Sequence, residues 1–196
     1  MAPRAGDYTY CDSDASLREA LTALRASSTL FLDCEGLDLG TKGGSLSLIS
    51  FRTTTPISAH TFVIDIVVLS ETSLRPLFDL LESTDVTKVV FDGRMDFSAL
   101  YHEYGVAMQG VVDLQLVDVR SRQQRGEDED DQLARLSPYL LRSEIFSNRT
   151  HYLQVQKLAG LNQCLQEHKV PGTGTKLPGT IHAHKALLRK SQECFL

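Results

Sequence analysis

The sequence has no tryptophan, and aromatic residues make up only 7% of its 196 residues. It also lacks any apolar run of the roughly 18 residues that a membrane-spanning helix needs. Near its start stand the charged residues Arg4, Asp7 and Asp12 in place of the apolar core of a secretory signal. These absences argue against a membrane protein and predict an intracellular one, in the nucleus or the cytoplasm.

Cysteine is scarce as well. The four cysteines, Cys11, Cys34, Cys164 and Cys194, are spread widely along the chain. Their spacing matches neither a zinc knuckle nor a disulfide framework, and reduced thiols fit an intracellular setting. We therefore interpret the cysteines as packing residues or chance occurrences.

The net charge of −5 hides an uneven distribution. Residues 1–131 carry 11 Lys and Arg against 22 Asp and Glu, whereas residues 132–196 carry 9 against 3. A carboxylate-rich segment needs cations, and a basic segment can meet phosphate. Solvated faces of ordinary helices explain the basic segment equally well.

Length and composition predict one soluble α/β domain with a substantial core. Helical spacing of apolar residues predicts helices over 16–25, with Asp14 or Ser16 as the cap, over 73–81, over 94–104 ended by Gly105, and after 113. Alternating or continuous apolar residues predict strands over 29–36, 45–51, 61–67, 88–92 and 110–113. The order predicts a mixed sheet of about five strands flanked by helices, in which an antiparallel three-strand meander precedes helix-connected strands.

The rest of the chain is harder to assign. Residues 120–131 contain no apolar residue and are expected to form an exposed, mobile loop. Beyond it, a helical part over 132–196 is expected, with helices near 151–167 and 181–190. A domain boundary at the loop is possible, but the last 65 residues look thin for a separate core. We therefore expect a single domain over 1–196, with its core in 16–119.

Two carboxylates stand in the middle of the first predicted strand. Asp33 and Glu35 are two residues apart, so they project from the same face with Cα atoms about 7 Å apart. No Lys or Arg is near them in sequence. A divalent cation, Mg²⁺ or Mn²⁺, would make such a pair tolerable, because hard ions prefer carboxylate oxygens. The alternative is that both side chains sit at an exposed end of the strand.

A third carboxylate strengthens the cation hypothesis. Asp96 falls in the first turn of the helix that follows the strand over 88–92, where helix capping is its simplest explanation. If that strand lies beside the first one, Asp96 points toward Asp33 and Glu35. The three carboxylates would then converge on one cation site.

These motifs resemble those of the DEDD-type 3′-5′ exonucleases, the ribonuclease D and Werner-type class with a ribonuclease H-like fold. The first motif is Leu32-Asp33-Cys34-Glu35-Gly36, the second covers residues 88–105, and Val112-Asp113 resembles the strand-to-helix step that follows. The chain most resembles fungal proteins of this class, in which an Asp-x-Arg-x-Asp second motif is common.

The resemblance implies a mechanism with two metal ions about 4 Å apart, one activating water and the other stabilising the departing 3′ oxygen. Asp33 would bridge the ions, Glu35 would hold the nucleophile-side ion, and Asp96 would support the second. The expected substrate is a single-stranded 3′ end of RNA or DNA.

Substrate contacts follow from the same resemblance. The backbone of Gly36 and Leu37 would contact the terminal nucleotide, and Asp92 and Arg94 of the second motif would lie beside it, with Arg94 able to meet a phosphate. Independently of the resemblance, stacking on terminal bases would fall to aromatic residues of the predicted helix over 94–104, such as Phe97, Tyr101 or His102, unless they pack in the core. Phe97 is expected to pack in the core instead.

The sequence departs from the class in its last motif. A Tyr-x3-Asp or His-x4-Asp usually supplies the general base and the fourth carboxylate, yet no aspartate follows Asp131. His168, His182 and His184 lack such an aspartate and are interpreted as surface histidines. We expect a chain that stops short of the motif, with a weak metal site and little activity.

Two alternatives stay open at this point: a catalytically dead, RNA-binding adaptor, and an α/β scaffold without a nucleic-acid role. The sequence does not decide between RNA and DNA and indicates no protein partner.

Overall fold

The computed structural model describes residues 8–54 and 59–170. Its contacts divide the chain into two compact units, which within the described residues cover 8–112 and 113–170. The expected single domain over the whole chain stays a prediction. No described helix is both long enough and apolar enough to cross a membrane.

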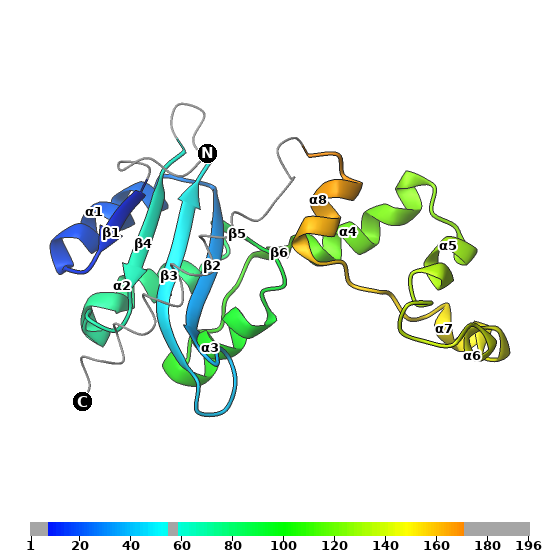
Figure 1. Ribbon diagram of the computed structural model, residues 1–196. Helices are drawn as coiled ribbons and strands as arrows, with labels where there is room; N and C mark the ends of the chain where they lie inside the picture. The colour runs from blue at the N-terminus through cyan, green and yellow to red at the C-terminus, as the bar shows by residue number, and fades with distance from the viewer. Residues whose placement is uncertain (1–7, 55–58, 171–196) are drawn as a thin grey trace. The chain divides into compact units, whose positions relative to one another are not determined.

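The first unit is built on a six-stranded mixed sheet, with strand order β1-β4-β3-β2-β5-β6 (Figure 1). In chain order its elements are β1 (Tyr8–Cys11), α1 (Asp14–Arg25), β2 (Thr29–Leu37), β3 (Ser45–Thr53), β4 (Thr61–Asp65), α2 (Glu71–Glu82), β5 (Thr87–Val90), α3 (Arg94–Tyr104) and β6 (Val111–Asp113). β2, β3 and β4 form the expected antiparallel meander, and β5 joins β2 in parallel. The predicted mixed sheet is confirmed, with one strand more than expected.

The additional strand is β1, which pairs in parallel with β4 at the edge of the sheet. Sequence analysis missed it because it has only four residues and its partner lies about fifty residues later. The helix that follows begins at a different cap than expected. The N-cap of α1 is Ser13, whose side chain forms a capping box with Ser16.

The core of this unit lies between the sheet and its helices. The inward-facing residues of β2 alternate along the strand: Leu30, Leu32 and Cys34 are buried, whereas Phe31 and Asp33 are exposed. The same cluster includes Leu17, Leu21 and Leu24 of α1 and Leu74, Leu77, Phe78 and Leu81 of α2. One face of β2 is therefore fixed by core packing, which leaves the opposite face for Asp33.

The second unit consists of short helices. They are α4 (Leu114–Arg122), the 3₁₀ turn η1 (Gln123–Arg125), α5 (Glu129–Ala134), α6 (Arg142–Ser147), α7 (Arg149–Tyr152) and α8 (Leu161–Glu167). The helix expected over 151–167 is interrupted, since α7 ends at Tyr152 and α8 starts after its N-cap Gly160. The helix expected near 181–190 lies outside the described residues.

The prediction of a loop over 120–131 is wrong, because helical structure occupies most of this segment. α4 continues to Arg122, and α5 starts with a capping box between Asp128 and Asp131. Two exposed carboxylates of α5, Glu129 and Asp130, pair with Arg149. Capping and ion pairs stabilise this segment in place of an apolar face.

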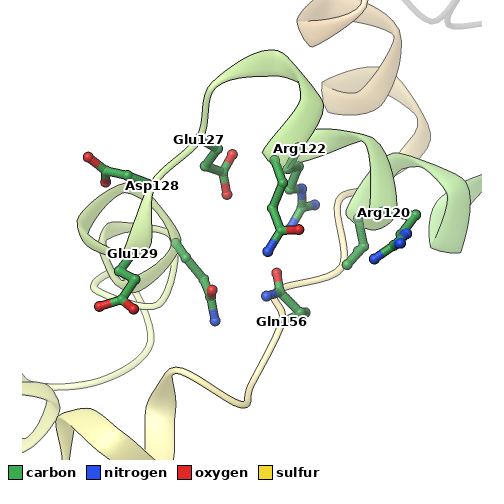
Figure 2. A pocket seen from close by; sticks show the side chains of 9 residues that line it. Arg120, Arg122, Glu127, Asp128, Glu129 and Gln156 are labelled. Atoms are coloured by element: carbon green, nitrogen blue, oxygen red, sulfur yellow. The ribbon is translucent and has the colours of Figure 1, made fainter.

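Charged residues also line a cavity of about 370 Å³ in this unit (Figure 2). Its wall includes Glu127, which is held by Arg135, and Arg122, which is only 2% exposed. Arg122 donates to Asp118 and to the carbonyl of Lys157, while its Nε is the one buried side-chain polar atom without a partner in the described part of the chain. This unit therefore combines buried charges with a small apolar cluster of Leu133, Leu136 and Ile145.

Candidate active site

β2 places two carboxylates on one face of the sheet. Asp33 is exposed and Glu35 is half-buried, and the buried Cys34 between them points to the opposite face. Their strand lies between β3 and β5, with Asp33 opposite Ser50 and Glu35 opposite Leu48. Asp33 is the fifth of the nine residues of β2, so it does not lie at the end of the strand, although both carboxylates lie beyond Phe31, the last residue that pairs with β5.

Asp96 is brought to this pair by the chain reversal after β5. Because β5 runs parallel to β2, the helix that follows it starts at the edge toward which β2 also runs. Asp96 lies in the first turn of α3 and is only 6% exposed. The Cys34 backbone, between Asp33 and Glu35, forms a hydrogen bond with the Asp96 carboxylate.

The surroundings of Asp96 shift its pKa. Burial, followed by the negative charge of Asp33, raises its pKa to about 7, and Glu35 adds to the rise, although the Cys34 hydrogen bond opposes it. Near neutral pH this carboxyl group is thus partly protonated. A cation beside the three carboxylates would remove the repulsion that disfavours its charged form.

Glycines permit close backbone approaches at the end of β2. A Cβ on Gly36 would lie 2.0 Å from the carbonyl oxygen of Ser45 in β3, and one on Gly40 would lie 2.5 Å from the carbonyl oxygen of Met95 in α3. Ser98 of α3 donates to the Gly40 carbonyl at 2.7 Å. The turn that contains Gly40 therefore ties the start of α3 to the end of β2, which fixes Asp96 relative to Glu35.

The remaining predicted site residues fall around the same edge. Asp92 has a left-handed backbone, with φ of 57°, and its carboxylate holds the Arg94 guanidinium through two contacts of 2.6 and 3.0 Å. Gly36 is half-buried and Leu37 is 45% exposed at the end of β2. The Arg94 side chain is 68% exposed and is held by Asp92.

Tyr101 lies on α3 with 49% of its surface exposed. Its ring is nearly parallel to that of Phe97, with centroids 5.9 Å apart and planes 8° apart. The expectation that Phe97 packs in the core is wrong, since it is 41% exposed. Sequence spacing could have suggested this pair, because residues four apart on a helix share a face.

The chemistry of the donor set suits a hard divalent ion. Asp33, Glu35 and Asp96 offer only carboxylate oxygens, which Mg²⁺ and Mn²⁺ prefer. The pKa of Asp96 is raised first by burial and then by the charge of Asp33. The thiol of Cys34 is buried on the other face of the strand, and its pKa is raised by burial and by Asp96, so it is no candidate ligand.

Comparisons with known proteins identify the family and the fold. A family model described as 3′-5′ exonuclease matches residues 8–163. No curated protein matches the chain. Ribonuclease D from Trypanosoma brucei is similar at a TM-score of 0.60 and 22% identity, over 92% of this chain and 53% of that one. Its complex with RNA U12 gives 0.50 and 22%, over 85% and 58%.

A third solved structure, the EXD2 exonuclease domain soaked in Mg and GMP, is similar at a TM-score of 0.50 and 20% identity, over 76% of this chain and 85% of that one. Likeness at such identities shows the shared fold, and it confirms the expected ribonuclease H-like exonuclease architecture. The chain spans little more than half the length of the two ribonuclease D structures. Since the family match covers most of its residues, this chain belongs to the 3′-5′ exonuclease family.

Proposed function

We propose that this domain binds the 3′ end of single-stranded nucleic acid and removes nucleotides from it with the help of Mg²⁺ or Mn²⁺. The observation that carries the proposal is that Asp96, buried at the start of α3, accepts a hydrogen bond from the Cys34 backbone, and that burial and then the charges of Asp33 and Glu35 raise its pKa. Mutual repulsion of neighbouring carboxylates costs stability, and a bound divalent ion would offset that cost. This supports a role of the three residues in binding metal.

Each residue has a definite task in this proposal. Asp33, Glu35 and Asp96 would hold the divalent ions, which when bound neutralise the scissile phosphate and supply a nucleophilic water. The exposed Arg94, oriented by Asp92, would contact a backbone phosphate. The backbone of Gly36 and Leu37 would position the terminal nucleotide at the end of β2.

RNA is the first substrate to test, since a similar ribonuclease D was solved with RNA U12. The assay uses 3′-labelled single-stranded RNA and DNA of one sequence, an excess of the 196-residue chain, and Mn²⁺ or EDTA. We expect slow, Mn²⁺-dependent release of labelled mononucleotide. The rate should be low because no aspartate follows Asp131 to act as a fourth ligand.

The same assay tests a second candidate function, an RNA-binding adaptor without catalysis. Binding of the labelled strands without any Mn²⁺-dependent cleavage, even at long incubation, would support the adaptor and rule out the nuclease for this chain. If the strands are neither bound nor cut, both candidates fail. The carboxylate cluster favours the nuclease, since an adaptor has no need of it.

The aromatic pair on α3 gives a prediction about binding. Replacing Tyr101 by alanine is expected to weaken single-strand binding at least about fivefold, because stacking of one base on an aromatic ring contributes about 1 kcal/mol or more. Fluorescence anisotropy with a labelled 3′ end measures the affinity. Tyr139, 67% exposed in the second unit, is the matched control, and Tyr139→Ala should bind as tightly as the wild type. Equal losses in both variants would count against a stacking role for Tyr101.

A further inference from the structure

A second group of metal-binding side chains lies in the second unit. Cys164 and His168 are one helical turn apart at the end of α8, and both face Asp118 of α4. The Asp118 side chain is fully buried, Cys164 is 8% exposed, and the His168 side chain is 36% exposed. The group is thus largely enclosed but reachable from solvent at His168.

The three side chains are spaced as ligands of a small ion. One ligand atom from each residue lies within 4.8 Å of the others, and Nε2 of His168 is 3.0 Å from Oδ1 of Asp118. In a tetrahedral zinc site the metal bonds are about 2.0 Å to nitrogen or oxygen and about 2.3 Å to sulfur, which puts neighbouring ligand atoms roughly 3.3 to 3.8 Å apart. Small side-chain rotations bring the three atoms to that spacing.

The guanidinium group of Arg125 supplies positive charge beside Asp118 and His168. Its Nη1 lies 2.5 Å from Nε2 of His168, and its Nη2 lies 3.0 Å from Oδ1 of Asp118. Nε2 of His168 therefore faces a donor and an acceptor at once. If Nε2 carries a proton, two donors, Nε2–H and the Arg125 guanidinium, face each other. If Nε2 carries no proton, its lone pair faces the Asp118 carboxylate. One of the two contacts is therefore unfavourable in either form.

A metal ion resolves this conflict. It would bind the lone pair of Nε2 and an oxygen of Asp118 together, while Arg125 would turn to Glu167, whose Oε2 is already 3.4 Å away. Arg122 would stay on the other oxygen of Asp118, at 2.8 Å, and orient the carboxylate.

We propose that Asp118, Cys164 and His168 form a site for Zn²⁺, separate from the carboxylate site on the sheet. A thiolate and an imidazole select Zn²⁺ or Co²⁺ over Mg²⁺ and Mn²⁺, whereas Asp33, Glu35 and Asp96 select the harder ions. On binding, the Cys164 thiol releases its proton to solvent and its thiolate coordinates the ion, and a water completes the coordination. The ion links α4 to α8.

Sequence analysis missed this group for a definite reason. The four cysteines share no short spacing, and the third ligand, Asp118, comes from a helix far from Cys164 in the chain. The one available signal was the Cys-x3-His spacing, which places both side chains on one face of a helix. His168, interpreted above as a surface histidine, is hydrogen-bonded to a buried aspartate.

Titration with Co²⁺ in excess Mg²⁺ tests the proposal without any nuclease assay. A thiolate ligand gives Co²⁺ a charge-transfer band in the near ultraviolet, which carboxylates do not produce. We expect one equivalent of Co²⁺ to develop this band and Zn²⁺ to abolish it by competition. Cys164→Ser should lose the band, and Cys34→Ser, the matched control from the active-site strand, should keep it.

Two further variants test the site if Cys164→Ser folds poorly. His168→Ala, at a partly exposed position, should weaken Co²⁺ binding at least about tenfold, since even loss of a residue that only supports a ligand costs that much. Arg125→Gln removes the competing cation and should tighten binding severalfold. A wild type and an Arg125→Gln variant that both fail to develop the band would overturn the proposal, as would a band that persists in Cys164→Ser.

Discussion

Replacing Asp33 by asparagine is expected to lower the Mn²⁺-dependent release of 3′ nucleotides at least about 100-fold, equivalent to the several kcal/mol that metal-assisted stabilisation contributes. Asp33 is exposed on the same face as Glu35, and its charge acts on Asp96. Asparagine keeps the shape of the side chain but removes the charge that holds a divalent ion. Single-turnover rates over a range of Mn²⁺ concentrations measure the loss.

Asp38 provides the matched control for this variant. It is an exposed aspartate in the turn directly after β2, and its φ of 44° is one that asparagine tolerates well. Asp38→Asn makes the same change of charge near the site and should leave the rate within about twofold, since a surface charge has little effect at physiological salt. If both variants lose activity to the same extent, the loss is explained by a general effect of charge, and the proposed role of Asp33 as a metal ligand is not supported.

Asp96→Asn is expected to stabilise the metal-free protein while removing its response to metal. The folded state raises the pKa of Asp96 to about 7, so between about pH 4 and about pH 7 the folded protein retains a proton that the unfolded chain releases. Stability therefore falls as pH rises through this window and stays low above it. At pH 8 the cost amounts to at most about 4 kcal/mol, at 1.36 kcal/mol for each unit of the shift.

Urea denaturation in EDTA at pH 5 and pH 8 measures this cost. The wild type should be less stable at pH 8 than at pH 5, and Asp96→Asn should remove that difference and gain its stability mainly at pH 8. Mn²⁺ should raise the melting temperature of the wild type but not of the variant. A variant that is destabilised at pH 8, or that still responds to Mn²⁺, would contradict the proposed role.

A second buried aspartate serves as the control with the opposite sign. Burial tends to raise the pKa of Asp118, but the hydrogen bonds from Arg122, Arg125 and His168 outweigh it and the pKa is lowered. Its charge contributes stability above the ordinary aspartate pKa, and that contribution is lost as pH falls through the lowered value. Asp118→Asn should therefore destabilise the protein at pH 8, because the buried Arg122 loses its ion pair.

The active-site region was predictable because its signals are local. The two-residue spacing of Asp33 and Glu35 determines that they share a face of a strand, and Gly105 ends α3 in the left-handed conformation that the sequence indicates. Placing Asp96 near them required one more assumption, namely that β5 pairs with β2. The parallel pairing of Leu30 with Lys88 confirms this assumption.

The second unit was harder to predict because polar contacts stabilise it. Hydrophobic periodicity does not detect α5, whose first turn is acidic and whose buried contribution is Leu133 alone. Nor does composition distinguish Arg122, buried against Asp118, from a solvated arginine. Such pairs depend on the tertiary neighbours of each charge, which local sequence does not specify.

The position of β2 between β3 and β5 has a consequence for how the site fails. Leu30 and Phe31 pair with both neighbouring strands, so hydrogen exchange of their amides requires opening of the sheet itself, whereas Asp33 and Glu35 pair with β3 beyond the last residue that pairs with β5. Leu30 and Phe31 should then belong to the slowest-exchanging segment of the first unit, and the segment of Asp33 and Glu35 to a faster one. Heat or denaturant would therefore disturb the two carboxylates before the paired start of their strand opens.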